Sequence, residues 1–333
     1  MPTKNLPFKT QQPSRKELAK LLVVIVNYRT ADLTIDCLHS LQREIDERGD
    51  TYVVVVDGAS GDDSPQKLSS AIEDNAWSDW AEVRALDTNG GFAYGNNAGF
   101  AEVLSGDIAS QYVLLLNPDT VAKPRALTEL IDFMDAHPSA GIAGSRLENR
   151  DGTARFSAFR FASPWSELES NIRLGLVSRL LQKHLINPPV QEQAHRTDWV
   201  AGASMIIRNQ VFDDIGTMDP TYFLYYEETD FCLRAKRAGW SCHYVPTSRI
   251  IHLVGQSSGI TGAGRTAKRV PAYWFASRKY YFQKNYGKIT ALMADSMWLL
   301  GYSLWTARRW LSRRPHIDPP KLGRDFIRWT LLN

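Results

Sequence analysis

An aspartate and a proline end one of the most apolar segments of this chain. Residues 112–116 read YVLLL and are followed by Asn117, Pro118 and Asp119. Proline fixes φ and has no N–H to donate, so a strand cannot continue through it. A carboxylate at this point would suit Mg²⁺ or Mn²⁺ bridging a diphosphate, because these cations prefer oxygen ligands. Asp119 could equally cap a helix that begins near residue 124.

Two adjacent glutamates follow an aromatic run later in the chain. Glu227 and Glu228 come directly after FLYY. A carboxylate among aromatic side chains and near a metal ion can serve as a general base. Neighbouring residues of a helix do not share a face, so only one of the two need point at a substrate. The alternative is a solvated helix start, because acidic residues favour the first turn.

Asp230 and Arg234 are spaced as an i,i+4 ion pair, which predicts a structural role.

Asp57 and His252 also stand at the ends of strand-like segments. Asp57 follows VVVV, where its carboxylate could accept a hydrogen bond from the imide N–H of a uracil or thymine, or cap the following turn. His252 follows RII and could bind a metal ion as a neutral imidazole, although an isolated histidine is most often structural.

The elements that must position these residues alternate between apolar strands and amphipathic helices. Buried strands are expected over 21–28, 51–57, 83–88 and 112–116. Helical spacing follows Thr30, and a second, short helix is expected over 72–80. This alternation predicts an α/β fold with a mostly parallel sheet flanked by helices, in which ligands bind at the carboxyl ends of the strands. Asn27, Asp57 and Asp119 all fall at such ends.

The glycine-rich segment NGGFAYGNNAGF, residues 89–100, invites comparison with a dinucleotide-binding loop. The dinucleotide fingerprint requires its glycines directly after the first strand, and these follow the third, which excludes a dehydrogenase. A glycine-rich loop that runs into a helix would still let the backbone approach a phosphate or ribose, with Gly91 and Asn96 as candidate contacts. The alternative is a tight loop with a helix cap. No basic, glycine-rich phosphate loop follows the first strand, which argues against a nucleotidyltransferase.

The pattern becomes looser after residue 138. Short strands with a turn at Asp151-Gly152 are expected over 141–156, helices and loops over 163–195, and a further strand over 198–209. In that last strand Gly202 leaves room for a ligand, and Trp199 and Gly202 are candidates to contact an acceptor substrate.

The net charge of +3 conceals a basic C-terminal region. Residues 265–333 contain 14 Lys+Arg and 3 Asp+Glu, a net charge of +11, while the rest contains 25 and 33, a net charge of −8. Residues 289–315 combine apolar side chains with tryptophans and arginines, which is typical of a helix lying on anionic lipid. A membrane surface therefore fits better than nucleic acid. A helix packed on the body is the alternative, and Asp295 argues against a membrane span.

The cysteines and the N-terminus indicate a cytosolic protein. Cys37, Cys232 and Cys242 lack zinc-ligand or CxxC spacing, which is typical of reduced thiols. Residues 1–20 carry charge but no apolar core, so we expect a leader before the first strand and not a secretory signal.

Taken in order, these segments resemble a known family. VVIVNYRT, VVVVDGASGD, NGGFAYGNNAGF, LLLNPDT, WVAGASMIIRN, DPTYFLYYEETDFCLRAKRAGW and RIIHLVGQS are similar in order and spacing to the motifs of inverting GT-A glycosyltransferases of family 2. The most similar subgroup is the bacterial rhamnosyltransferases of O-antigen and cell-wall polysaccharide assembly. The resemblance covers residues 21–258.

The resemblance implies roles for individual residues. The nucleotide would contact Asn27, Tyr28, Arg29 and Asp57. Asp119 and His252 would bind the metal ion. Asn117 would contact the ribose or a water molecule. The family's Glu-Asp pair, whose second member is the base, falls on Glu227-Glu228. Because Glu stands here in place of Asp, the base is one methylene longer, and which of the two reaches the acceptor hydroxyl stays open. Asn89-Gly90-Gly91-Phe92 departs mildly from the family's Asn-Leu-Gly-Phe.

The resemblance also implies an organisation and a function. We expect a leader over 1–20 and a GT-A catalytic domain over 21–260, with a nucleotide-sugar half to residue 120 and an acceptor half from 121. A basic, tryptophan-rich helical region would follow over 261–333. The implied reaction moves a sugar, with dTDP-rhamnose as the expected donor, to a lipid-linked saccharide at the inner face of the cell membrane. A UDP-hexose donor or a non-catalytic nucleotide-sugar-binding scaffold are the alternatives, and the oligomeric state is left open.

Overall fold

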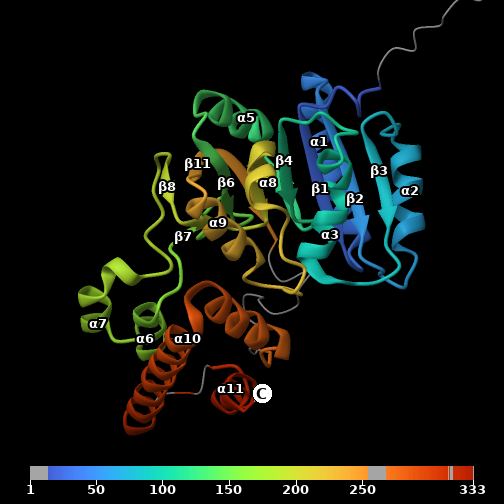
Figure 1. The fold of residues 1–333 in the computed structure, drawn as a ribbon. Helices are drawn as coiled ribbons and strands as arrows, with labels where there is room; N and C mark the ends of the chain where they lie inside the picture. Colours follow the sequence, from blue (N-terminus) through green and yellow to red (C-terminus); the bar gives the residue numbers. More distant parts are fainter. Residues whose placement is uncertain (1–13, 254–267, 314, 316–317, 333) are drawn as a thin grey trace, which may run out of the picture.

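A curved central sheet organises the protein, for which a computed structural model describes residues 14–253, 268–313, 315 and 318–332. Nine strands of the described residues form this sheet, in the order β3-β2-β1-β4-β10-β6-β11-β5, with β8 beside β11 (Figure 1). The strands are β1 (Leu21–Asn27), β2 (Thr51–Asp57), β3 (Ala81–Ala85), β4 (Tyr112–Leu116), β5 (Thr120–Ala122), β6 (Ala140–Glu148), β8 (His195–Thr197), β10 (Ser204–Arg208) and β11 (Ser241–His252). A separate pair, β7 (Ala158–Phe159) and β9 (Trp199–Val200), lies beside it. Residues 1–13 of the expected leader and 261–267 of the expected C-terminal region lie outside the described residues.

The two halves of the sheet differ in strand direction. Strands β3, β2, β1 and β4 are parallel, as the apolar runs predict. Beyond them β10 runs antiparallel to both β4 and β6, and β11 is parallel to β6 but antiparallel to β5 and β8. The first half therefore has the carboxyl ends of β1, β2 and β4 at one edge, where ligands bind in such sheets.

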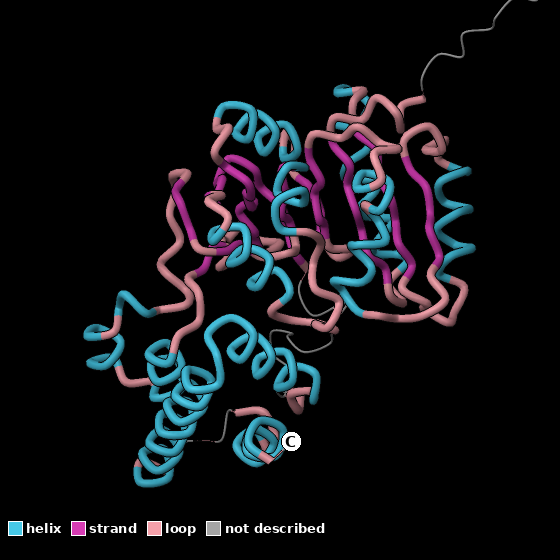
Figure 2. The backbone as a smooth tube through the Cα atoms, viewed as in Figure 1, coloured by secondary structure: helices cyan, strands magenta, loops and turns pink. Residues whose placement is uncertain are grey.

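Helices cover both faces of this sheet (Figure 2). Alternate residues of β1 enter two separate cores, with Val23 in one and Val24 in the other. Helices α1, α2 and α5 contribute to the first core, and α3, α4, α8 and α9 to the second. The helices of the described residues are α1 (Ala31–Arg48), α2 (Ser64–Asp74), α3 (Gly91–Gly99), α4 (Ala101–Leu104), α5 (Ala126–Ala136), α6 (Pro164–Ile172), α7 (Gly175–Leu180), η1 (Gln182–His184), α8 (Asn209–Ile215), α9 (Glu227–Arg237), α10 (Ala272–Leu311), α11 (Leu322–Phe326) and the π-helix η2 (Ile327–Leu331).

Two elements of the first half of the chain differ from their expected positions. The short helix expected over 72–80 begins earlier, as α2, because Pro65 favours a first helical turn and Asp62 accepts a hydrogen bond from the Ser64 N–H. The glycine-rich segment is itself helical from Gly91 onward. Gly95 and Gly99 lie four residues apart, and a Cβ on them would come within 2.8 Å of Val26 and 2.2 Å of Val24. These glycines let α3 approach β1 closely.

The C-terminal region packs on the body through α10. Its first half contributes Tyr281 and Phe282 to a core shared with Tyr222. A non-helical φ of 81° at Gly287 separates the two halves of the helix. The second half packs on α6, and Trp298 stacks on Phe326 of α11 with ring centroids 3.8 Å apart. None of the helices in the described ranges is long and apolar enough to cross a membrane.

Arg278 joins α6 to both halves of α10. Its buried guanidinium lies 2.6 Å from Asp295 Oδ1 and 3.2 Å from Glu167 Oε2. The rings of Phe282 and Phe326 lie on it, with centroids 4.9 and 5.0 Å away. Burial raises the pKa of both Glu167 and Asp295, and the positive charge of Arg278 opposes that rise.

We expect Arg278→Leu to lower the free energy of unfolding by about 3–5 kcal/mol at pH 7.5, because two buried carboxylates lose their partner. In the variant, burial would hold the pKa values of Glu167 and Asp295 above those of the unfolded chain. The variant therefore loses stability as the pH rises from the unfolded to the folded pKa values, and part of that stability should return at pH 5. Urea unfolding at the two pH values measures the effect. Arg313→Leu, at an exposed position near the end of the same helix, should change stability by no more than about 0.5 kcal/mol. An equal loss at both pH values would contradict this account.

Candidate active site

Asp119 and His252 meet where β4, β5 and β11 come together. Pro118 ends β4, and the three-residue strand β5 begins directly after Asp119. Thr120 pairs with His252 in the β5–β11 register, which places His252 Nε2 3.2 Å from Asp119 Oδ1 and 3.4 Å from Asn117 Nδ2. The helix that follows, α5, begins only at Ala126, so the expectation that Asp119 caps it is excluded.

The environment of Asp119 fits a divalent cation. Asp119 is buried, yet neither of its carboxylate oxygens accepts a hydrogen bond from a described residue. A buried carboxylate without donors is costly unless a cation compensates it. Within the described ranges no group of three or more His, Cys, Asp or Glu side chains is placed to hold a metal ion. Asp119 and His252 would therefore supply two ligands, and substrate phosphates and water the others, as is usual for Mg²⁺.

Asn27 and Asp57 form a buried network behind this edge. They are paired in the β1–β2 register, and Asn27 Nδ2 donates a hydrogen bond of 2.7 Å to Asp57 Oδ2. Ser60 donates to the same carboxylate through its hydroxyl at 2.6 Å and its N–H at 3.0 Å. Asp57 thus caps the turn that follows it, which is one of the two interpretations of the sequence. Contact between Asp57 and a nucleotide stays a prediction.

The loops after β1 and β2 are fastened together by Arg29 and Ser60. Arg29 has a φ of 56°, and its N–H and Nε donate to Ser60 Oγ and Ser60 O at 2.9 and 2.8 Å. The neighbouring Tyr28 is exposed, with the Arg29 guanidinium 5.2 Å from its ring centroid. The sequence singled out Tyr28 and Arg29 but missed Ser60, whose only signal was its place in the Gly/Ser/Asp turn.

The start of α3 touches the loop that precedes the two glutamates. Phe92 N donates to Phe223 O at 2.9 Å, and a Cβ on Gly91 would lie 1.9 Å from that oxygen. Only glycine allows this approach, and the φ of 87° at Gly91 also favours it. Asn89 Oδ1 accepts a hydrogen bond from Gly91 N at 3.0 Å, and Asn96 Nδ2 donates to Phe92 O at 2.9 Å. The glycine-rich segment therefore holds residue 223, shortly before the glutamates, at the carboxyl edge of the sheet.

A turn at residues 201–203 connects the metal-ion candidates with the glutamates. On one side Asn117 N donates to Ala203 O at 3.1 Å. On the other, a Cβ on Gly202 would lie 3.1 Å from the ring of Phe92 and 3.9 Å from Glu228 Cβ. The turn interrupts the strand expected over 198–209, which the structure divides into β9 and β10.

Trp199 lies in the neighbouring two-stranded sheet. Its indole Nε1 donates to Arg160 O at 3.0 Å, and its ring stacks on Phe159 with centroids 4.2 Å apart. The side chain thus has packing partners of its own, and its contact with an acceptor stays a prediction.

Glu227 and Glu228 begin α9 in different environments. Glu227 is buried, and burial together with the charge of Glu228 raises its pKa well above the usual range. Glu228 is partly exposed, although its Oε2 is buried and has no hydrogen-bond partner among the residues that the structure describes. Burial raises the pKa of Glu228 to about 6, and backbone groups of Glu228 and Gly202 oppose the rise. A carboxyl group with a pKa near neutrality is suited to proton transfer.

Helix α10 fixes the loop that carries these glutamates. Tyr280 and Lys284 donate to Asp219 at the start of the loop, at 2.9 and 2.8 Å. Lys284 and Asn285 also donate to Asp230, which forms the expected ion pair with Arg234 at 2.9 Å. Tyr225 and Tyr226, directly before Glu227, have φ values of 71° and 72°, a conformation that persists only where surrounding contacts hold it. No sequence motif had pointed to this role of α10.

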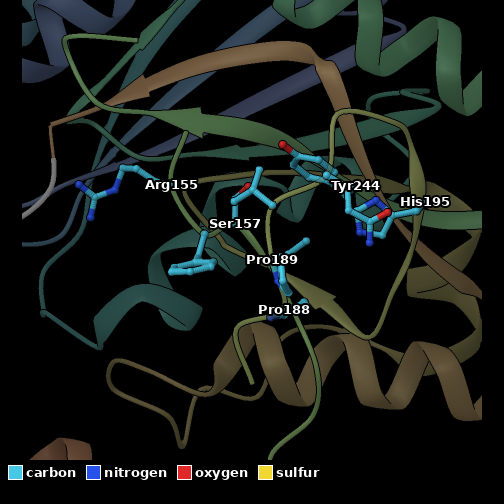
Figure 3. Close-up of a pocket in the computed structure, with 10 residues that line it drawn as sticks. Arg155, Ser157, Pro188, Pro189, His195 and Tyr244 are labelled. Atoms are coloured by element: carbon cyan, nitrogen blue, oxygen red, sulfur yellow. The ribbon is translucent and has the colours of Figure 1, made fainter. Parts of the chain in front are cut away.

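Two hollows on the described surface lie elsewhere. One is lined by residues that include Arg155, Ser157, Pro188, Pro189, His195 and Tyr244 (Figure 3). The other, of about 440 Å³, is lined by Arg160, Arg196, Asp198, Lys236 and neighbouring residues. Neither is lined by Asp119, His252 or Glu228, so the contacts described above define the candidate site.

Comparisons with known proteins agree with this architecture. A model of the family "Glycosyltransferase like family 2" matches residues 19–279. The N-acetylglucosaminyl-diphospho-decaprenol L-rhamnosyltransferase of Mycobacterium tuberculosis is 27% identical over 283 residues, which are 80% of this chain and 82% of that protein. A low-salt glycan biosynthesis hexosyltransferase, Agl10 of Haloferax volcanii, is 30% identical over 222 residues, 66% of this chain and 62% of that protein.

Solved structures share the fold. The mannosyltransferase PcManGT from Pyrobaculum calidifontis, in complex with GDP-Man and Mn²⁺, superimposes with a TM-score of 0.55 at 13% identity, covering 93% of this chain and 79% of that one. The mixed sheet with its flanking helices and C-terminal helix is a GT-A fold. The chain belongs to glycosyltransferase family 2 and is a glycosyltransferase.

Proposed function

We propose that this protein is a metal-dependent, inverting glycosyltransferase that moves rhamnose from dTDP-rhamnose to a hydroxyl of a lipid-linked saccharide. The observation that supports the proposal is the contact of His252 with Asp119 at the end of β4, next to a turn at residues 201–203 that lies against both Asn117 and Glu228. The decaprenol-linked rhamnosyltransferase supports the sugar and the kind of acceptor by its name. The product would enter bacterial surface polysaccharide such as O-antigen.

The two halves of the catalytic domain would bind different substrates. Residues 21–120 would bind the nucleotide sugar, and 121–260 would supply the acceptor site and the base. A divalent metal ion, Mg²⁺ or Mn²⁺, held by Asp119 and His252 would neutralise charge on the departing diphosphate. Asn27 and Asp57 would shape the nucleotide side through the loop that they fix, with Tyr28 exposed at its edge.

Glu228 would act as the general base. It would take the proton from the acceptor hydroxyl while the oxygen forms a bond to the anomeric carbon. The bond from that carbon to the diphosphate oxygen breaks on the opposite face, and the electron pair leaves with the nucleoside diphosphate. The anomeric configuration is therefore inverted. Glu228 then releases its proton to solvent.

The environments of the two glutamates favour Glu228 over Glu227 for this role. Glu227 is buried, and burial together with the charge of Glu228 raises its pKa well above the usual range, which disfavours the ionised form that a general base requires. Glu228 lies beside Gly202, in the turn that also contacts Asn117. A scaffold without activity would have no need of a carboxyl group tuned in this way.

A donor panel tests the proposed substrate. We expect dTDP-rhamnose with Mn²⁺ to raise the melting temperature more than UDP- or GDP-sugars do, since a ligand stabilises the folded state according to its affinity. The shift should be much smaller without the metal ion, and transfer to a polyprenyl-diphosphate saccharide should follow the same order. A larger shift with UDP-hexoses would favour the alternative donor, which the similarity to a hexosyltransferase also supports.

A lipid-linked acceptor would require the enzyme to act at a membrane. A saccharide carried on a polyprenyl diphosphate is confined to the lipid surface, so we propose that the protein acts from the cytoplasm as a peripheral protein on the inner face of the cell membrane. The basic C-terminal region would attach it to anionic lipid.

A further inference from the structure

The second half of α10 is apolar on its solvent-facing side. Its other side carries Ala291, Trp298 and Gly301, which are buried. The solvent-facing side forms an outer stripe at helical spacing, which consists of Ile289, Leu292, Met293, Ser296, Leu300, Ser303, Leu304, Ala307 and Leu311. A surface helix of a globular protein normally presents polar or charged residues outward.

The outer stripe is strongly exposed and carries no charge. Ile289 is 79% exposed, Leu292 60% and Leu311 73%. The only ionisable residue between Lys288 and Arg308 other than tyrosine is Asp295, which turns inward to Arg278. The stripe runs for about six turns, or roughly 33 Å, along the helix. Figure 1 shows this half of α10 extending away from the nine-stranded sheet, so the sheet does not cover it.

Basic residues border the outer stripe at both ends. Lys288 precedes it, and Arg308 and Arg313 stand at its end beside Trp310, which is 77% exposed. The acidic residues of this region are all neutralised within the protein, in the pairs Asp295–Arg278, Asp318–Arg309 and Asp325–Arg269. Lys288 and Arg313 have no acidic partner among the described residues.

We infer that the outer stripe with its basic border is a docking face for an anionic membrane surface. The apolar side chains would enter the boundary between headgroups and acyl chains, and Trp310 would lie at headgroup level. The lysine and arginines would meet lipid phosphates. A second copy of the chain fits less well, because a two-fold contact over the stripe would bring like-charged ends of two basic regions together.

This inference deepens the proposed function and rests on it only for the choice of a lipid surface. The same helix fixes the loop before Glu227 with its first half, through Ser277, Tyr280 and Lys284. Deleting the whole C-terminal region would remove this support along with the outer stripe. The test must therefore use point variants of the full chain.

Flotation of the full chain with vesicles tests the docking face. We expect the protein to float with phosphatidylcholine vesicles that contain phosphatidylglycerol, and Leu292→Asp/Leu304→Asp to reduce the bound fraction at least about tenfold, because two charges would have to enter the apolar boundary. The matched control is Leu18→Asp/Leu104→Asp, at two other exposed leucines, which should float as wild type does. Lys288→Ser/Arg313→Ser should weaken flotation and its dependence on salt.

Several outcomes would overturn the inference. These are a wild-type protein that stays at the bottom of the gradient, stripe variants that float as wild type does, and equal binding to purely zwitterionic vesicles. A wild-type dimer that the stripe variants convert to monomer without vesicles would assign the face to a second copy. Melting of each variant with and without dTDP-rhamnose and Mn²⁺ tests donor binding separately, so that failure of the proposed function is distinguished from failure of membrane docking.

Discussion

Glu228→Gln should abolish most of the transferase activity while leaving the protein folded. The amide has nearly the same shape but cannot accept a proton, and a general base typically contributes about 10²–10⁴-fold to the rate. The wild-type enzyme should gain activity as the pH rises through about 6, because burial raises the pKa of Glu228 to about 6 and only its ionised form is a base. Single-turnover rates with saturating donor and acceptor measure both effects.

Glu227→Gln is the matched control for this substitution. Burial and the charge of Glu228 raise the pKa of Glu227, which disfavours its ionised form, and the amide of the variant has nearly the same shape as the carboxyl group. We expect turnover to fall by no more than about tenfold, with the rise near pH 6 retained. A larger loss in Glu227→Gln than in Glu228→Gln would transfer the role of base to Glu227.

Asp119→Asn should remove metal-dependent donor binding and lower transfer by roughly 10²-fold or more, since the ion stabilises charge on the leaving diphosphate. Without a metal ion, the variant should be at least as stable as wild type. Neither buried oxygen of Asp119 accepts a hydrogen bond from a described residue, and only His252 Nε2, 3.2 Å from Oδ1, lies close to it as an ion-pair partner, so the substitution removes a poorly compensated carboxylate. Thermal melting with and without Mn²⁺ separates the two effects.

Asp57→Asn, at the end of another strand of the same sheet, should lower stability, whereas Asp119→Asn should not. Asp57 accepts hydrogen bonds from Asn27 and from two donors of Ser60. Introducing an amide N–H among these donors should destabilise the fold by about 1–3 kcal/mol. If Asp119→Asn instead lost as much stability as Asp57→Asn, Asp119 would be a structural residue and its assignment as a metal ligand would be wrong.

The sequence by itself determined the alternation of strands and helices and the polar residues at the strand ends. The four-valine and three-leucine runs are typical of short strands buried on both faces, and Pro118 must end such a strand. For that reason the sequence alone assigns Asn27, Asp57 and Asp119 to one edge of the sheet. The family motifs then indicated the chemistry, because their order and spacing are specific.

Only the tertiary structure decided how those residues are used. Asp57 and Asp119 look alike in the sequence, but Asp57 accepts several hydrogen bonds and Asp119 accepts none from the described residues. This difference depends on contacts between segments far apart in the chain. The difference between Glu227 and Glu228 likewise arises from burial, which no local pattern encodes. Both sides of the second half of α10 are apolar, but in the sequence this segment shows only as an apolar run interrupted by polar residues. Packing of one side on α6 and α11 decides which side remains exposed.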